Sequence, residues 1–430
     1  MVQPTTEATV SLLFRQGGRP GSLVYNEENG GVGVGDEGSV AVSSVTAILA
    51  LSTFVSACIA FGIGCSMGYS SPTQSSIMED LGLSVAEFSL FGSILSIGGI
   101  LGAVVSGKIT DLLGRKLTMW ILNLFYISGW LAIAFAKVPW LLNLGRLSLG
   151  FTKGISSYLV LVYIAEITTK NVRGRFSAIV PLMVCWGLSF MYVVGSFVHW
   201  RTLALIATIP GLLQLLLLFF IPESPRWLDF VESLKSFSKE GIFDIFQKKY
   251  VRPLLLVVGM LVLLNLGGVN AFTYYSGVIF VSTGISSMVG LITMAAVQTV
   301  TGILGTTLID KSGRRPLALV SSAGLCFSSF LTGLSFCLKM YMGMYVLGAG
   351  MPLLLLSELF PINVKGSAVS IGNFLGDISG LLVAYYFNIV IEWNSAAFCF
   401  ANFVLSATMV PKTKGRTLEE IQASITRSSY

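Results

Sequence analysis

Long apolar segments alternate with short polar ones along most of the 430-residue chain. A helix rises about 1.5 Å per residue, so crossing the hydrocarbon core of a membrane takes roughly 20 apolar residues. By that rule the predicted spans are 44–68, 88–106, 117–136, 139–164, 176–198, 202–221, 253–276, 286–309, 316–338, 341–360, 366–391 and 395–410. The pattern therefore predicts an all-α membrane protein with twelve transmembrane helices, six on each side of a polar central stretch.

The polar stretches divide the chain into five parts. Residues 1–42 are polar and Gly-rich, which predicts a disordered cytosolic tail. A six-helix bundle is expected over 43–222 and a second over 252–411. Residues 223–251 form the predicted cytosolic linker, and 412–430 a cytosolic C-terminal tail.

Composition agrees with a membrane protein and removes several other classes. The chain is 54% hydrophobic and only 11% charged, whereas a soluble domain is about a quarter charged. The net charge of +6 comes mostly from Lys and Arg in alternate loops, so it indicates which loops face the cytosol rather than a nucleic-acid partner. Both termini fall on that charge-rich side. The six cysteines lack metal or redox spacing, so we predict no metal and no cofactor.

The sequence offers no chemistry for catalysis. It holds no nucleophile–base–acid set, no metal-ligand cluster and no phosphate-binding loop. We therefore predict that the protein is not an enzyme, and that its partners are the lipid bilayer and a small molecule. The oligomeric state is left open, and a monomer is compatible with the sequence.

Three charged landmarks occur once in each half, in the same order. All three lie at predicted helix ends on the cytosolic side. The candidate residues are Asp111, Arg115, Glu166, Arg173, Glu223 and Arg226 in the first half, and Asp310, Arg314, Arg315, Glu358 and Arg416 in the second. Such a parallel repeat indicates two homologous halves, with a substrate site near mid-membrane between them.

Acids and bases at these helix ends are candidates for a gate. We predict that they pair across helices when the cytosolic mouth is closed and separate when it opens. Each pair is expected to be partly hydrated and to contribute about 1 kcal/mol or less. The alternative is that the charges only anchor helices at the membrane interface. A separate stripe of small residues, Gly98, Gly102 and Ser106, predicts close helix packing.

Several motifs together resemble one transporter family. They are GKITDLLGRK at 107–116, PESPRWL at 222–228, GGVNAFTYY at 267–275, DKSGRRP at 310–316 and TKGRTLEEIQ at 413–422. These stretches resemble the sugar-porter family of the major facilitator superfamily, and most closely the plant early-responsive-to-dehydration-like monosaccharide transporters. The resemblance implies the major facilitator fold and hexose transport by alternating access.

The resemblance also implies a sugar site made of amides and aromatic rings. At matching positions stand Asn265, Asn270 and Gln298, with Tyr274 and Tyr275 where aromatics help to close the outer side. Other positions depart from the family pattern. Leu264, Pro181 and Leu353 replace two glutamines and a tryptophan, and Gly376-Asp377 replaces Asn-Trp.

Two charges fall in the middle of predicted spans, Lys153 and Asp377. Charge is costly inside a membrane and normally has a partner. We predict that the two residues line a hydrated cleft and interact. The alternative is a tolerated substitution without a role.

The resemblance bears on energy coupling as well. Proton-linked members of the family carry an Asp after the Gly-Tyr of span one, paired with an Arg in span four. Here Ser70 follows Gly68-Tyr69 while Arg146 is present, so we predict facilitated diffusion rather than proton symport. The alternative is a transport-impaired paralogue or splice form that acts as a sensor or interaction partner. The membrane is predicted to be vacuolar or plasma membrane.

Overall fold

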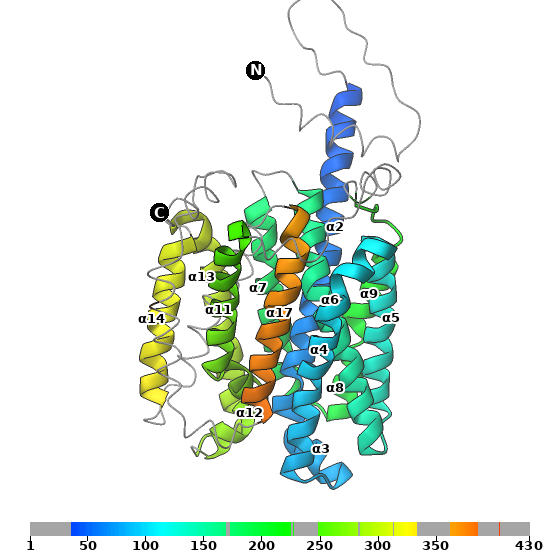
Figure 1. Ribbon diagram of the computed structural model, residues 1–430. Helices are drawn as coiled ribbons and strands as arrows, with labels where there is room; N and C mark the ends of the chain where they lie inside the picture. Colours follow the sequence, from blue (N-terminus) through cyan, green and yellow to red (C-terminus); the bar gives the residue numbers. More distant parts are fainter. Residues whose placement is uncertain are drawn as a thin grey trace, which may run out of the picture.

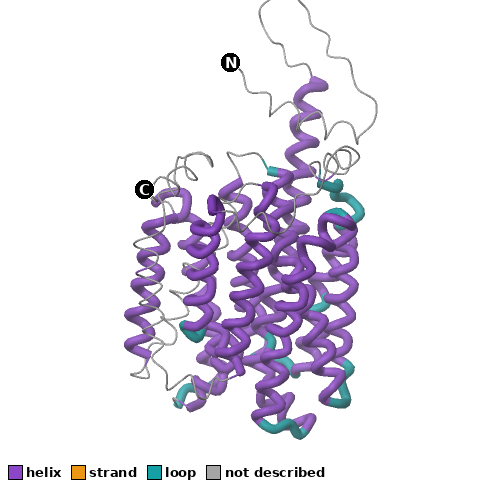
Figure 2. Tube along the Cα trace, viewed as in Figure 1, coloured by secondary structure: helices purple, strands orange, loops and turns teal. Residues whose placement is uncertain are grey.

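The computed structural model describes the backbone of residues 36–168, 173–224, 227, 248–282, 284–312, 314–332, 362–385 and 404. Every described element is a helix, and the long helices run side by side in one bundle (Figures 1 and 2). Among the described residues, seven helical segments are long and apolar enough to cross a membrane, if Trp200–Leu217 is counted as one segment. This arrangement confirms the predicted all-α membrane class.

The first half contains eight described helices. Their bounds are α2 (Asp36–Gly68), α3 (Ser70–Leu81), α4 (Val85–Leu113), α5 (Arg115–Ala134), α6 (Pro139–Ile167), α7 (Arg173–Gly195), α8 (Trp200–Ile206) and α9 (Ile209–Leu217). The second half contributes α11 (Lys248–Leu266), α12 (Val269–Ser282), α13 (Ser287–Ser312), α14 (Arg314–Thr332) and α17 (Ile362–Tyr385). The predicted spans 341–360 and 395–410 lie outside the described residues, apart from residue 404.

Two predicted spans are broken in the structure. The span 202–221 divides into α8 and α9, with a proline at the start of α9. The span 253–276 divides into α11 and α12 at Gly268, whose φ of 95° lies in the left-handed region that glycine tolerates. Both breaks fall inside apolar runs, so hydropathy alone does not detect them.

One helix was not predicted, and another begins earlier than expected. The polar segment Ser70–Leu81 forms α3 at the opposite end of the bundle from the start of α2 (Figure 1). Its sequence is too polar to count as a span, and a Ser84–Glu87 capping box starts the next helix directly after it. Helix α2 begins at Asp36, inside the predicted tail 1–42.

Glycines allow the closest helix contacts in the first half. A Cβ atom at Gly98 or Gly102 would meet the backbone of α6, and one at Gly154 would meet the backbone of α4. Small residues on facing helices let their backbones approach, which replaces the hydrophobic drive that is absent in lipid. The predicted packing role of the Gly98–Gly102 stripe is therefore confirmed. Between the halves, α17 packs on α4 and α13 packs on α7.

Candidate functional site

A one-residue turn brings charged side chains together at the junction of α4 and α5. Gly114 is the only residue between the two helices, and its φ is 84°. A Cβ atom there would lie 2.8 Å from Oε2 of Glu223 and 3.1 Å from the Trp227 ring. Backbone conformation and space both require glycine at this position.

The turn places Arg115 at the start of α5, against the end of α6. Its Nε and Nη2 atoms donate to the two carboxylate oxygens of Glu166, at 3.0 and 2.9 Å. Nη1 also lies 3.2 Å from Oδ1 of Asp111, four residues earlier in the last turn of α4. The Arg115 and Glu166 side chains are only 8% and 7% exposed. The Arg115–Glu166 pair, which was expected to be partly hydrated, is therefore buried. It is also bidentate, which is the geometry that guanidinium and carboxylate groups favour.

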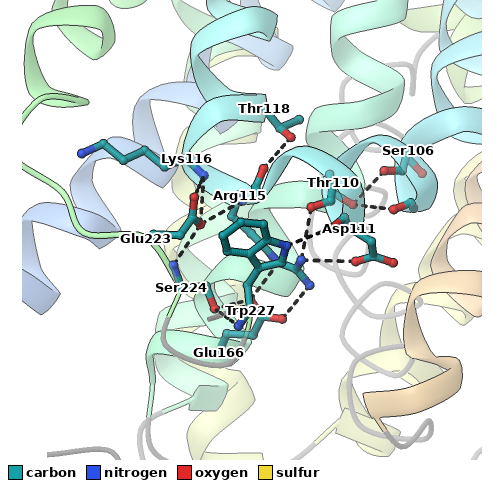
Figure 3. Close-up of polar contacts among 12 residues, drawn as sticks. Ser106, Thr110, Asp111, Arg115, Lys116, Thr118, Glu166, Glu223, Ser224 and Trp227 are labelled. Carbon is teal, nitrogen blue, oxygen red and sulfur yellow. Dashed lines mark hydrogen bonds and ion pairs between the residues drawn. The ribbon is translucent and has the colours of Figure 1, made fainter. Parts of the chain in front are cut away.

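The polar segment after α9 completes this group of residues (Figure 3). Glu223 accepts hydrogen bonds from the backbone N–H groups of Arg115 and Lys116, at 2.9 and 3.1 Å. A carboxylate at a helix N-terminus satisfies free N–H groups and the helix dipole. Ser224 donates to Glu166 at 2.6 Å, and the Trp227 indole donates to the Asp111 carbonyl at 2.9 Å.

We call Asp111, Arg115, Glu166, Glu223, Ser224 and Trp227 the hairpin cluster. The sequence indicated its four charged members. Ser224 and Trp227 belong to the motif PESPRWL, but their roles were not predicted, because their partners are far away in the chain. All six residues belong to the first half or the segment directly after it. The hairpin cluster therefore joins helices of one half to each other.

The remaining gate candidates are only partly visible. Arg173 begins α7, Asp310 lies near the end of α13, and Arg314 and Arg315 begin α14, but their side chains are not described. Arg226, Glu358 and Arg416 lie outside the described residues. Their predicted pairing stays a prediction.

A second buried arginine has no carboxylate partner among the described residues. Arg146 on α6 is fully buried and donates to the Ser66 carbonyl at 2.5 Å and to the Ser70 hydroxyl. Its guanidinium carbon lies 4.7 Å from the centre of the Phe91 ring and 5.6 Å from that of Tyr69. Ring faces and neutral oxygens therefore surround this cation.

The two predicted sugar-binding asparagines meet across the break between α11 and α12. Asn270 donates to Oδ1 of Asn265 at 2.9 Å. Both amides face α17: a Cβ atom at Gly376 would lie 3.5 Å from Nδ2 of Asn265, and one at Gly380 would collide with the Asn270 amide. Gln298 instead lies buried between α13 and α7, 3.5 Å from the Ser189 hydroxyl.

The predicted outer-side tyrosines pack against the first half. Tyr274 and Tyr275 on α12 are buried in one cluster with Phe88 and Phe91 of α4. The next residue, Ser276, shares a 2.9 Å hydrogen bond with Ser71 of α3. We call these contacts between α12 and the first half the α12 seam. In this structure the halves are closed against each other along that seam.

The two mid-membrane charges form an ion pair between the halves. Nζ of Lys153, halfway along α6, lies 2.7 Å from Oδ1 of Asp377 on α17. The predicted interaction is confirmed. The two side chains are 13% and 15% exposed, so the pair is largely but not fully enclosed.

A cavity with a mainly apolar lining and a few polar groups lies inside the first half, among α2, α5, α6 and α9. Its lining includes Asn123, Thr152, Lys153 and Gln214. Oδ1 of Asn123 is buried without a hydrogen-bond partner, so this cavity suits an ordered water molecule. It lies within one half, whereas the sequence predicted the substrate site between the two.

Outside the membrane-spanning segments, α3 carries a carboxylate tied to α8. The Trp200 indole donates to Oδ2 of Asp80 at 2.8 Å, and Nε2 of His199 lies 3.0 Å from the same atom. The Trp200 hydrogen bond favours the charged carboxylate and so holds the pKa of Asp80 below its ordinary value.

Comparisons with known proteins match nearly the whole chain. The sequence pattern of the Major Facilitator Superfamily matches residues 51–384. The Arabidopsis thaliana protein "Sugar transporter ESL1" is 42% identical over 439 residues, covering 89% of this chain and 93% of the relative. "Sugar transporter ERD6-like 15" from the same plant is also 42% identical, covering 88% of this chain and 92% of the relative.

Solved structures show the same fold. The proton:xylose symporter XylE, bound to 6-bromo-6-deoxy-D-glucose, superposes with a TM-score of 0.73 at 21% identity. The match covers 88% of this chain and 99% of that chain. An inward-open conformation of XylE from E. coli gives a TM-score of 0.71 at 21% identity, covering 86% and 98%.

Proposed function

This chain belongs to the sugar-porter family of the Major Facilitator Superfamily, and from that premise we propose that it carries a neutral hexose by facilitated diffusion. The family membership makes it a multi-pass sugar transporter and not an enzyme. Two parts of the proposal go beyond family membership. The monosaccharide substrate rests on Asn265 and Asn270, and uniport rests on the residues around Arg146.

The surroundings of Arg146 carry the proposal of uniport. A carboxylate beside this arginine would be a group that takes up and releases a proton while the cation stays charged. The described contacts of Arg146 are instead a carbonyl, a serine hydroxyl and two aromatic rings. None of them changes its charge in the physiological pH range. Sugar movement through this protein then follows the sugar gradient alone.

The alternating-access cycle uses the contacts between the halves. We place the α12 seam on the outer side and the hairpin cluster on the cytosolic side, following the positive-inside rule. Opening to the outside separates Tyr274 and Tyr275 from the first half. The hairpin cluster keeps the first half rigid meanwhile, so that the half moves as one body. The membrane is the vacuolar or the plasma membrane, with both termini in the cytosol.

Purified protein in liposomes tests the proposal. Uptake of radiolabelled glucose is expected to be saturable, to stop when inside and outside concentrations are equal, and to be unchanged by an imposed proton gradient. Accumulation driven by that gradient contradicts uniport. Glucose binding without saturable flux favours a sensor or interaction partner over a carrier.

The variant Ser70→Asp sharpens the test, because it places a carboxylate beside Arg146. Uptake by this variant is expected to depend on pH, whereas uptake by the matched variant Ser70→Asn is not. Equal pH profiles for the two variants contradict the role assigned to the surroundings of Arg146.

A further inference from the structure

The ion pair between Lys153 and Asp377 joins the two halves in the interior of the bundle. Both residues stand near the middle of their helices, and the helices belong to different halves. Helix α17 runs beside α4 in the bundle (Figure 1). A charge at this depth is costly, and such residues usually face a pathway or a partner. The two side chains are 13% and 15% exposed, so protein atoms do not enclose the pair completely.

Gly99 of α4 allows Asp377 to approach the first half closely. A Cβ atom at that position would lie 2.6 Å from Oδ2 of Asp377 and 3.6 Å from Nζ of Lys153. The absence of a side chain at this position therefore lets the Asp377 carboxylate pack directly against the backbone of α4. Lys153 bonds to Oδ1, whereas Oδ2 is the oxygen on the Gly99 side, at the contact between α17 and α4.

Asp377 also stands next to the two asparagines along α17. Gly376 and Gly380 face Asn265 and Asn270, and Asp377 lies between those glycines in sequence. Polar groups from α6, α11, α12 and α17 are thus gathered at one level of the bundle. Small-molecule binding sites typically combine a mostly apolar lining with a few polar groups of this kind.

We propose that the Lys153–Asp377 pair is a sugar-binding element, which deepens the proposed function and rests on it. The Asp377 carboxylate accepts hydrogen bonds from two neighbouring hydroxyls of the sugar, and the Lys153 ammonium donates to a sugar oxygen. Hydrogen bonds to charged groups are roughly twice as strong as neutral ones. The pair thereby replaces amides that are missing at other positions, such as Leu264 and Leu353.

The pair also selects the class of substrate. Its two charges cancel, so a neutral polyol with adjacent hydroxyls fits without leaving either charge unmatched. A sugar acid or a sugar phosphate brings its own negative charge close to Asp377 and is disfavoured. The element therefore favours neutral monosaccharides over their anionic derivatives.

The competing explanation is a tie that only holds the two halves together. The two roles differ in kinetics. A binding group affects the sugar concentration at half-maximal rate (KM), whereas a tie affects the maximal rate of turnover. Glucose flux in liposomes and equilibrium glucose binding in detergent measure the two properties separately.

The experiment compares Asp377→Asn and Lys153→Met with the control Lys137→Met, which removes an exposed lysine in the loop before α6. Losing one charged hydrogen-bond partner is expected to weaken glucose binding and raise KM roughly tenfold or more. The control is expected to match the wild type. Raised KM in both pair variants supports the proposal, whereas a changed maximal rate with unchanged KM and binding overturns it.

Deoxyglucoses identify the bonded hydroxyls. In the wild type, removing a hydroxyl that donates a hydrogen bond to Asp377 is expected to weaken glucose binding. In Asp377→Asn the same removal is expected to weaken binding much less. Fully additive losses for every deoxyglucose overturn the proposal.

Two further measurements keep the test decisive. If single variants do not fold, the exchange Lys153→Asp with Asp377→Lys keeps an ion pair but moves the acceptor to the other half. Weakened glucose binding by this folded variant supports the proposal, and unchanged binding overturns it. If wild-type protein binds glucose without flux, only the carrier proposal fails. If it neither binds nor moves any neutral monosaccharide, both proposals fall.

Discussion

Arg115 and Arg146 are both buried in the first half, yet their surroundings are opposite. Arg115 meets two carboxylates, Glu166 and Asp111. The described contacts of Arg146 are two aromatic rings and two neutral oxygens. Burying a charge costs several kcal/mol unless close partners compensate. The first arginine is therefore part of a structural junction, and the second is a charge whose cost has to be justified by what the protein does.

The difference also separates a fixed contact from a changeable one. The hairpin cluster lies within one half, so we expect it to keep its geometry whichever way the halves move. Lys153–Asp377 and the α12 seam lie between the halves, so they change during any cycle that moves one half against the other. Charge pairs within one half are thus expected to stabilise that half, and charge pairs between the halves are expected to form and break during transport.

Removing Arg115 is expected to have the largest effect on this comparison. In Arg115→Met, Glu166 keeps its charge in a buried place without its main partner. The free energy of unfolding should fall by about 3–5 kcal/mol, measured by denaturant unfolding in detergent micelles. Lys116→Met, which changes a more exposed neighbour, serves as the control. Partial recovery is expected in the double variant Arg115→Met with Glu166→Met, and an unaltered unfolding curve for the single variant contradicts the structural role.

Glu223→Gln tests the other side of the hairpin cluster with a smaller effect. The amide keeps one acceptor oxygen for the start of α5 but loses the negative charge that faces the helix N-terminus. We expect a loss of about 1–2 kcal/mol in the same unfolding measurement, because these hydrogen bonds are charge-assisted. A loss as large as that of Arg115→Met would mean that Glu223, rather than the Arg115–Glu166 pair, holds the junction together.

Arg146→Met should change stability least. It removes a buried charge with no carboxylate partner among the described residues, so no counter-charge is left stranded there. The free energy of unfolding is expected to stay within about 1 kcal/mol of the wild type, since burying apolar atoms offsets the two lost hydrogen bonds. A fall as large as for Arg115→Met would show that a carboxylate outside the described residues compensates Arg146.

The sequence predicted most of the spans because bilayer thickness fixes how long an apolar run must be. It did not predict α3 or the breaks at α8–α9 and α11–α12. A polar helix outside the hydrocarbon carries no hydropathy signal, and a Gly or Pro inside a long apolar run does not interrupt that signal. Tertiary contacts decide these features.

The candidate sites were predicted to different depths for similar reasons. Lys153 and Asp377 were expected to meet because each lacked a partner in its own apolar surroundings. At the hairpin cluster the sequence indicated charged residues but not which base meets which acid. Arg115 and Glu166 are separated by a complete helical hairpin, and Trp227 lies farther still. Spacing along the chain does not encode such contacts.

The turn at Gly114 has a consequence for how the chain is made. With a single residue between α4 and α5, no loop separates the two helices, so α4 cannot insert far ahead of α5 during synthesis. We therefore expect both segments to leave the translocation channel and enter the bilayer as one antiparallel unit. A bulky residue at Gly114 would then harm biogenesis before any finished molecule exists to be tested for transport.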